Sequence, residues 1–238
     1  MRHKTRLRWA ILLPLASLPL PRPLNAQVPS PNPTAVRAGD VVAVGTGTVL
    51  ALLPRVLGVG SGTVACAPCD PRTLPGFDRW VVRETNAVWG RASDFLLLGL
   101  LLFGGVSTAT QDAGGPYVTG MVEAGVWTAA VTEWVKAGVA RHRPVMYTED
   151  APAAAADVNN VRSFPSGHAS LAFGVATSYW LARRDLTGSP GAAAWAVAGA
   201  AAGVGAFRML AGKHFLSDVL AGALLGVAGG AAVHAIKF

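Results

Sequence analysis

Long apolar stretches separated by short polar turns fill the chain after residue 40. None of them alternates apolar and polar residues in the way that a half-buried strand does. We interpret six stretches as helices of an all-α bundle, several of them close to the roughly 20 residues that a helix needs to cross a membrane. In chain order the predicted helices are Val41–Gly60, Asp94–Thr110, Tyr117–Val139, His168–Ala182, Ala192–Leu210 and Phe215–Ala235.

These six stretches differ in how strongly they predict a membrane span. The second is the strongest candidate, because Phe95–Phe103 contains only Phe, Leu and one Gly. The first is the weakest, since Pro54 and Arg55 interrupt it, and this favours a helix that re-enters or lies on the surface. Glycine and alanine are abundant, and in membrane bundles such small residues let helices approach closely. We therefore predict a membrane-embedded helical bundle with a six-helix core.

The first 40 residues predict export followed by a linker. A basic stretch from Arg2 to Arg8 precedes an apolar run, and Ala26 offers a small residue for cleavage. This pattern is typical of a secretory signal peptide over residues 1–26, with an uncleaved membrane anchor as the alternative. A Pro-rich linker would then occupy residues 27–40, and the helical domain residues 41–238.

Composition supports the membrane and argues against nucleic acid. Only 14% of the residues are charged and 52% are hydrophobic, whereas soluble domains carry about 25% charged residues. The formal net charge is +7, but five of the basic residues lie in residues 1–26, which contain no acid. The remainder has no basic stripe of the kind that binds nucleic acid, so we expect membrane lipid, not nucleic acid, as the partner.

The two cysteines, Cys66 and Cys69, are separated by Ala and Pro. In an exported chain this spacing favours a local disulfide that staples a loop, although two free thiols remain an alternative. A structural zinc site needs about four ligands, and nothing nearby supplies the other two. We therefore predict no metal at this position.

Three polar patches carry the candidate chemistry. Lys136, Arg143 and Arg208 are cations at the ends of apolar helices, where a charge is costly unless it is paired or functional. Guanidinium and ammonium groups suit a phosphate, and three of them would neutralise the charge that develops in phosphoryl transfer without a metal. A long connection, about Val145–Arg162, directly precedes the sharpest of the patches, and connections of this length are often functional.

That sharpest patch runs from Ser163 to His168 and reads as a turn that feeds a helix. The N–H groups of Ser166, Gly167 and His168 are predicted to face an anion at the helix N-terminus. His168 would then be placed to donate a proton to a leaving oxygen.

His214 and Asp218 are four residues apart, which predicts one face of a helix. A carboxylate that holds one imidazole nitrogen aims the other nitrogen at a target. Taken singly, each candidate also has a simpler structural role. Lys136 can pair with Glu133, and His214 with Asp218 can be a surface pair.

The joint pattern resembles the three-part motif of type 2 phosphatidic acid phosphatases. The matching residues are Lys136 and Arg143-Pro144, then Pro165-Ser166-Gly167-His168, then Arg208, His214 and Asp218. They span about a third of the chain, and their spacing is specific. One departure is Phe207, since the family usually has serine before the third-motif arginine, and this puts phosphate affinity or substrate preference in doubt.

The resemblance implies a mechanism and a fold. His214 would attack phosphorus and become phosphorylated, Asp218 would orient it, and His168 would protonate the leaving group and then activate water. The phosphoryl oxygens would be held by Lys136, Arg143, Ser166, Gly167 and Arg208, without a cofactor. The implied fold is a six-helix bundle, and the implied substrate is a phospholipid or polyprenyl phosphate such as phosphatidic acid, phosphatidylglycerol phosphate, undecaprenyl diphosphate or a lipid A phosphate.

Three alternatives use the same pocket: a vanadium-dependent haloperoxidase, a soluble periplasmic acid phosphatase, and a binder or transporter without activity. The resemblance to bacterial members predicts the inner membrane with the site facing the periplasm. With a cleaved signal, this orientation requires that Val41–Gly60 does not cross. It also leaves Arg183, Arg184 and Lys237 in the cytoplasm, in agreement with the excess of positive residues on the cytoplasmic side of membrane spans.

Overall fold

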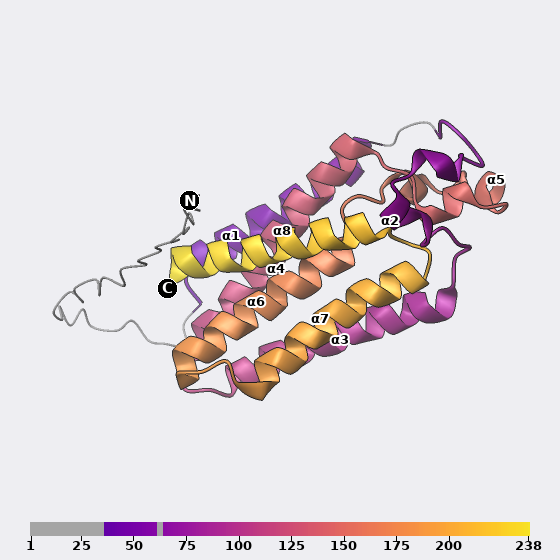
Figure 1. Cartoon of the computed structure of the whole chain (residues 1–238). Helices are drawn as coiled ribbons and strands as arrows, with labels where there is room; N and C mark the ends of the chain where they lie inside the picture. Colours follow the sequence, from indigo (N-terminus) through magenta and orange to yellow (C-terminus); the bar gives the residue numbers. More distant parts are fainter. Residues whose placement is uncertain (1–35, 61–63) are drawn as a thin grey trace, which may run out of the picture. The chain divides into compact units, whose positions relative to one another are not determined.

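The structure is a computed structural model that describes residues 36–60 and 64–238 and contains no strand in those two ranges (Figure 1). The all-α prediction is confirmed. The predicted signal peptide over residues 1–26, its cleavage near Ala26 and most of the linker over residues 27–40 lie outside the described residues. The six long helices are α1 (Ala38–Val56), α3 (Ala87–Ala109), α4 (Gly115–Val139), α6 (Gly167–Thr187), α7 (Gly191–Leu210) and α8 (Leu216–Lys237).

Short helices fill the connections at one end of this bundle. Figure 1 shows α2 and α5 close to the ends at which α6 and α8 begin. The long connection predicted between the third and fourth stretches is therefore not a plain loop. The short elements are η1 (Pro71–Thr73), α2 (Gly76–Arg79), η2 (Pro144–Tyr147), α5 (Ala151–Ala154) and η3 (Val158–Val161).

Helix α1 is continuous, so the predicted interruption at Pro54 and Arg55 is wrong. Proline lacks an N–H group and leaves the carbonyl four residues earlier without its helical donor. Here that carbonyl belongs to Leu50, and the indole Nε1 of Trp134 donates to it at 3.1 Å. The neighbouring helix thus satisfies the group that proline frees.

Four helices in the described part of the chain are long and apolar enough to cross a membrane: α1, α3, α7 and α8. The outward faces of α1, α3 and α8 are apolar. Water-soluble monomers rarely expose apolar patches of this extent, so the helices indicate membrane association. The exposed side chains include Val41, Val49, Leu52, Phe95, Leu98, Leu102, Phe103, Val106, Leu220, Leu224 and Val227.

Helix α6 lies at the centre and packs against α3, α4, α7 and α8, whereas α1 packs mainly against α4. Helices α1 and α4 run parallel, because Gly47 lies against Val126 and Arg55 bonds to Glu133 further along both helices. The C-terminal ends of α1, α4 and α7 therefore meet the N-terminal ends of α3, α6 and α8.

Glycines hold α8 close to α6. A Cβ atom added to Gly222 would lie 2.5 Å from the carbonyl oxygen of Ser166, and one added to Gly230 would lie 2.6 Å from that of Gly174. Larger residues would separate the two backbones. At the start of both helices the Ser166 amide donates to the Asp218 carbonyl at 2.9 Å. This close packing brings the second and third sequence patches together.

Candidate active site

The predicted site residues all lie at one end of the bundle. Lys136 is in the last turn of α4, Arg143 precedes η2, and Arg208 is in the last turn of α7. Ser166 caps α6, Gly167 and His168 begin that helix, and His214 lies between α7 and α8. These cations interact with the imidazole rings of both His168 and His214. Arg208 interacts electrostatically with His168 and with His214, and Lys136 and Arg143 each interact with one of them.

His214 is 1% exposed and has a defined tautomer. Its Nδ1 lies 2.8 Å from the carbonyl oxygen of Ser163. A carbonyl only accepts hydrogen bonds, so Nδ1 carries the proton and Nε2 keeps its lone pair. The nearest oxygen of Asp218 is 3.7 Å from Nδ1. The predicted hydrogen bond from Nδ1 to the Asp218 carboxylate is thus replaced by one to the Ser163 carbonyl. The carboxylate remains nearby as a negative charge.

The predicted placement of His214 and Asp218 on one helix face is wrong. Helix α8 begins at Leu216, so His214 lies in the connection before it. Asp218 instead accepts the backbone N–H of Phe215 at 2.9 Å and the hydroxyl of Ser163 at 2.6 Å through Oδ2. A carboxylate at the third helical position commonly caps the helix start in this way. Asp218 therefore defines the turn that carries His214.

Burial lowers the pKa of His214 to about 3, and Arg143 and Arg208 add to this while Asp218 opposes it. Desolvation penalises the charged form of the ring. At neutral pH the ring is therefore uncharged and has an available lone pair on Nε2, which is the form that a nucleophile needs.

Lys136 forms an ion pair with Glu133 and also lies next to the start of α6. Its Nζ lies 3.2 Å from Glu133, which also bonds to Arg55 and Arg162. The simpler structural role is therefore present. The same Nζ lies only 3.2 Å from the point where a Cβ on Gly167 would stand, so this ammonium group also contacts the start of α6.

Arg143 and Lys213 add half-buried positive charge that forms no ion pair among the described residues. Burial lowers the pKa of Arg143, and no hydrogen-bond partner for its Nε exists among the described residues. Burial also lowers the pKa of Lys213, as do Arg143 and Arg208. Lys213 was not predicted, although its place beside His214 could have suggested it. Half-buried cations without an ion-pair partner indicate an anionic ligand.

The start of α6 offers fewer amides to an anion than predicted. The N–H of Ser166 donates to Asp218, and its hydroxyl oxygen accepts the N–H of Ala169 at 3.4 Å. The N–H groups of Gly167 and His168 have no acceptor in the described ranges. Two amides, not three, are thus free to meet an anion at this helix N-terminus.

A family model described as the PAP2 superfamily matches residues 117–238, which is just over half of the chain. The chain belongs to the PAP2 superfamily. The matched part contains all eight predicted site residues. PAP2 members are phosphatases or haloperoxidase-like proteins, so the chain is in general a phosphoester hydrolase of this type. No match was found among curated proteins or among solved structures.

Outside the part matched by the PAP2 model, Asp94 of α3 reaches the site. Its Oδ1 lies 2.8 Å from His168 Nε2 and 3.5 Å from Arg208 Nη1. Arg208 also donates to the hydroxyl of Ser93 at 3.2 Å. Asp94 was seen in the sequence only as the start of an apolar stretch. Helix α3 in fact begins seven residues earlier, where Asn86 accepts two first-turn amides.

Phe207, which stands where PAP2 proteins usually have serine, packs against Trp89. The two ring centroids are 5.2 Å apart. The contact joins α7 to the first turn of α3 beside Arg208. An aromatic pair thus takes the place of a hydroxyl at this position.

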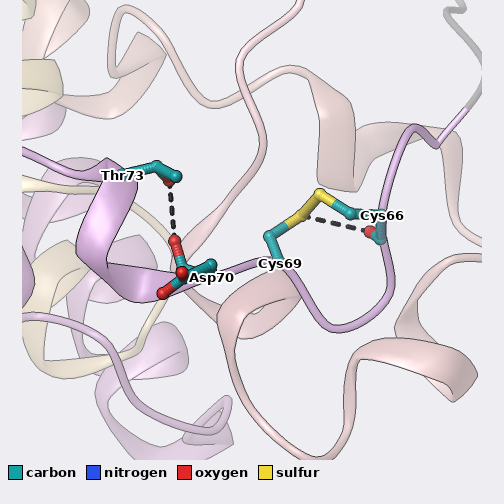
Figure 2. The surroundings of a disulfide bond; sticks show 4 residues. All are labelled: Cys66, Cys69, Asp70 and Thr73. Carbon is teal, nitrogen blue, oxygen red and sulfur yellow. Dashed lines mark hydrogen bonds between the residues drawn. A yellow bond between two sulfur atoms is a disulfide. The ribbon is translucent and has the colours of Figure 1, made fainter.

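The predicted local disulfide is present at the site end of this PAP2 chain. Figure 2 shows Cys66 joined to Cys69, ahead of the turn that Asp70 and Thr73 form. The amide of Cys69 donates to the Met146 carbonyl at 2.8 Å and so attaches this segment to η2. His142 lies close to both sulfurs, but disulfide sulfurs are not thiolates and do not act as metal ligands.

The neutral state of His214 makes folding sensitive to acid. Its pKa is about 3 in the folded chain and 6.5 for an ordinary histidine, so between these values the unfolded chain binds more protons. Stability therefore falls as the pH is lowered through this window. We expect the thermal unfolding midpoint in detergent to fall more steeply below pH 6.5 in the wild type than in His214→Asn. Parallel curves for the two proteins would contradict this prediction.

Proposed function

We propose that this protein hydrolyses the phosphate or diphosphate of a membrane lipid through a phosphohistidine on His214. The observation that carries the proposal is the state of that ring. It is buried and neutral, its Nδ1 proton is donated to the Ser163 carbonyl, and Arg143 and Arg208 act on it, each with an Nε atom that has no hydrogen-bond partner among the described residues. A lone pair on a neutral imidazole beside excess positive charge suits attack on an anionic phosphorus centre.

In the first step, His214 Nε2 forms a bond to phosphorus and the bond from phosphorus to the lipid oxygen breaks. His168 gives a proton to that oxygen, so that the alcohol, or a lipid monophosphate, leaves neutralised. Asp94 holds Nε2 of His168, which leaves Nδ1 for proton exchange. The phosphoryl oxygens are held by Lys136, Arg143, Ser166, Arg208 and the amide of Gly167.

In the second step, His168 takes a proton from water and the water oxygen attacks phosphorus. The phosphorus–nitrogen bond breaks, inorganic phosphate leaves, and His214 returns to its neutral form. Asp218 lies 3.7 Å from Nδ1 of His214. A carboxylate at that distance stabilises the positive charge that the ring gains when Nε2 bonds to phosphorus.

A lipid substrate fits the position of the site. The site lies at the ends of helices whose outer faces are apolar, where a lipid headgroup meets the membrane surface. Trp89 and Phe207 lie beside Arg208 and offer apolar contact near the phosphate. Phosphatidic acid, phosphatidylglycerol phosphate, undecaprenyl diphosphate and lipid A phosphates all share this chemistry.

We further propose that the site faces the periplasm of a bacterial inner membrane. The disulfide of Cys66 and Cys69 lies at the site end and suits an oxidising compartment. Arg183 and Arg184 lie towards the opposite end of α6. Since α1 runs parallel to α4, a crossing α1 must then begin on the cytoplasmic side. A signal cleaved near Ala26 would instead place the start of α1 in the periplasm, so these two predictions exclude each other when α1 crosses.

The test is release of inorganic phosphate by protein purified in detergent, from the four lipid phosphates above, in excess EDTA. We expect release from at least one lipid, unchanged by the chelator. Activity lost with EDTA would contradict a metal-independent mechanism. Bromide oxidation on adding vanadate and peroxide, without phosphate release, would favour the haloperoxidase alternative. No activity of either kind would favour a binder.

A further inference from the structure

A second charged cluster lies behind His214, away from the phosphate-binding cations. It consists of Asp78 on α2, Arg141 after α4, and Ser217 and Asp218 in the first turn of α8. Asp78 and Asp218 are both 0% exposed. Two fully buried carboxylates are costly unless they are paired and hydrogen-bonded, so the partners of each oxygen matter.

Every oxygen of Asp78 has a defined partner on another element. Oδ1 accepts the backbone N–H of Ser217 at 3.0 Å, and Oδ2 accepts its hydroxyl at 2.6 Å. Oδ2 also accepts Nη2 of Arg141 at 2.8 Å. The amide of Ser217 belongs to the first turn of α8, where the N–H groups have no acceptor within the helix. Asp78 therefore caps α8 from outside and binds Arg141 at the same time.

Arg141 connects Asp78 to the nucleophile. Its Nη1 donates to Asp218 Oδ1 at 2.6 Å, and its guanidinium lies 4.4 Å from the centre of the Phe215 ring. The other oxygen of Asp218 accepts the hydroxyl of Ser163, whose carbonyl holds His214. The contacts are continuous from Asp78 to the imidazole.

We propose that Asp78 and Arg141 are positioning residues, which fix Asp218 and the connection carrying His214 so that Nε2 stays aimed at the phosphate. The inference rests on the proposed function. Neither residue contacts the phosphate-binding cations by a hydrogen bond, and Asp78 lies outside the part matched by the family model. The segment between α1 and α3 thus contributes to catalysis through one side chain.

Charge gives Asp78 a second effect besides geometry. One guanidinium is shared by two carboxylates. If Asp78 loses its charge, Arg141 is paired with Asp218 alone and cancels more of the negative charge that His214 senses. His214 gains positive charge when it bonds to phosphorus, so a weaker field from Asp218 raises that barrier. An Asn at position 78 keeps an acceptor for Ser217 and removes this charge.

The kinetic test compares Asp78→Asn and Arg141→Gln with a matched control, Asp70→Asn. Asp70 (Figure 2) belongs to the same segment but is exposed, and it pairs with Arg72. We expect kcat to fall by about 10- to 100-fold in each of the first two variants, with KM within about 2-fold because the phosphate ligands are intact. The double variant should lose no more than about the larger single effect, since the two residues act as one unit. Independent, multiplying losses, or a change in KM alone, would overturn the inference.

A measurement that needs no activity separates this inference from the proposed function. In protein labelled with ¹⁵N-histidine, the His214 Nδ1–H signal is assigned by its loss in His214→Gln. We expect a slowly exchanging signal in the wild type and in Asp70→Asn, and a shifted or broadened one in Asp78→Asn. An identical signal in all three contradicts the inference. A wild type that releases no phosphate, yet shows the expected change, contradicts the proposed function alone.

Discussion

Replacing His214 by glutamine is expected to reduce phosphate release by about 10⁴-fold or more. Glutamine has a similar size and can still donate to the Ser163 carbonyl, so the surrounding fold should persist. It has no lone pair that can attack phosphorus, so no phosphorylated intermediate can form. The measurement is single-turnover release of phosphate from the best lipid substrate in excess chelator.

A matched control comes from the other end of the bundle. His234 lies in the last turn of α8 and pairs with Asp185 at 2.9 Å. His234→Gln should retain activity within about 2-fold, since this partly buried residue lies at the end of α8 opposite the site. Turnover by His214→Gln at a rate near that of the control would remove His214 from the mechanism.

The cations proposed to bind phosphate could be picked out from the sequence because their chemistry is local to each motif. Lys136, Arg143 and Arg208 are charges at the ends of apolar stretches, and such charges require a function or a partner wherever the helices lie. The glycine and histidine after Pro165 likewise predict a helix start. The structure brings these patches to one end of the bundle, as their joint occurrence suggested.

The supporting residues were not predictable, since their roles depend on distant contacts. Asp94 meets His168 across 74 positions of sequence, and Asp78 meets Ser217 across 139. A lone carboxylate in a loop or at a helix start has no pattern that indicates its partner. Arg141 lies two residues before Arg143 of the first motif. In the sequence it is therefore interpreted as a charge that flanks the motif. Only the fold shows that Arg141 binds Asp218, whereas Arg143 forms no ion pair among the described residues.

Two errors concern how the backbone satisfies its own polar groups. Pro54 was expected to interrupt the first apolar stretch, but a donor from α4 compensates for its missing N–H and the helix continues to Val56. The spacing of His214 and Asp218 was read as a helix face, but the carboxylate caps the turn before the helix begins. In both cases the partner of a single amide or carbonyl group decided the outcome.

Replacing Arg143 by methionine is expected to lower kcat/KM by about 10²- to 10⁴-fold. Methionine has a similar length and fills the same space but supplies no donor or charge for the phosphoryl oxygens. Lys136 keeps its pair with Glu133, and Arg208 its contacts with Ser93 and Asp94. Of the three predicted cations, Arg143 therefore has the fewest contacts with protein acceptors, and it has the most donors available for a ligand.

Stability should move in the opposite direction from activity in this variant. Arg143 is half-buried beside other cations, and its Nε has no partner among the described residues, so its removal relieves repulsion and desolvation. We expect Arg143→Met to unfold at a higher temperature than the wild type in phosphate-free detergent, and to lose the stabilisation that added phosphate or vanadate gives the wild type. The control is Arg184→Met, which alters an exposed pair with Asp185 far from the site and should change neither property. Unchanged stabilisation by phosphate in Arg143→Met would show that this guanidinium does not hold the anion, and the excess positive charge at this end of the bundle would then need a different ligand.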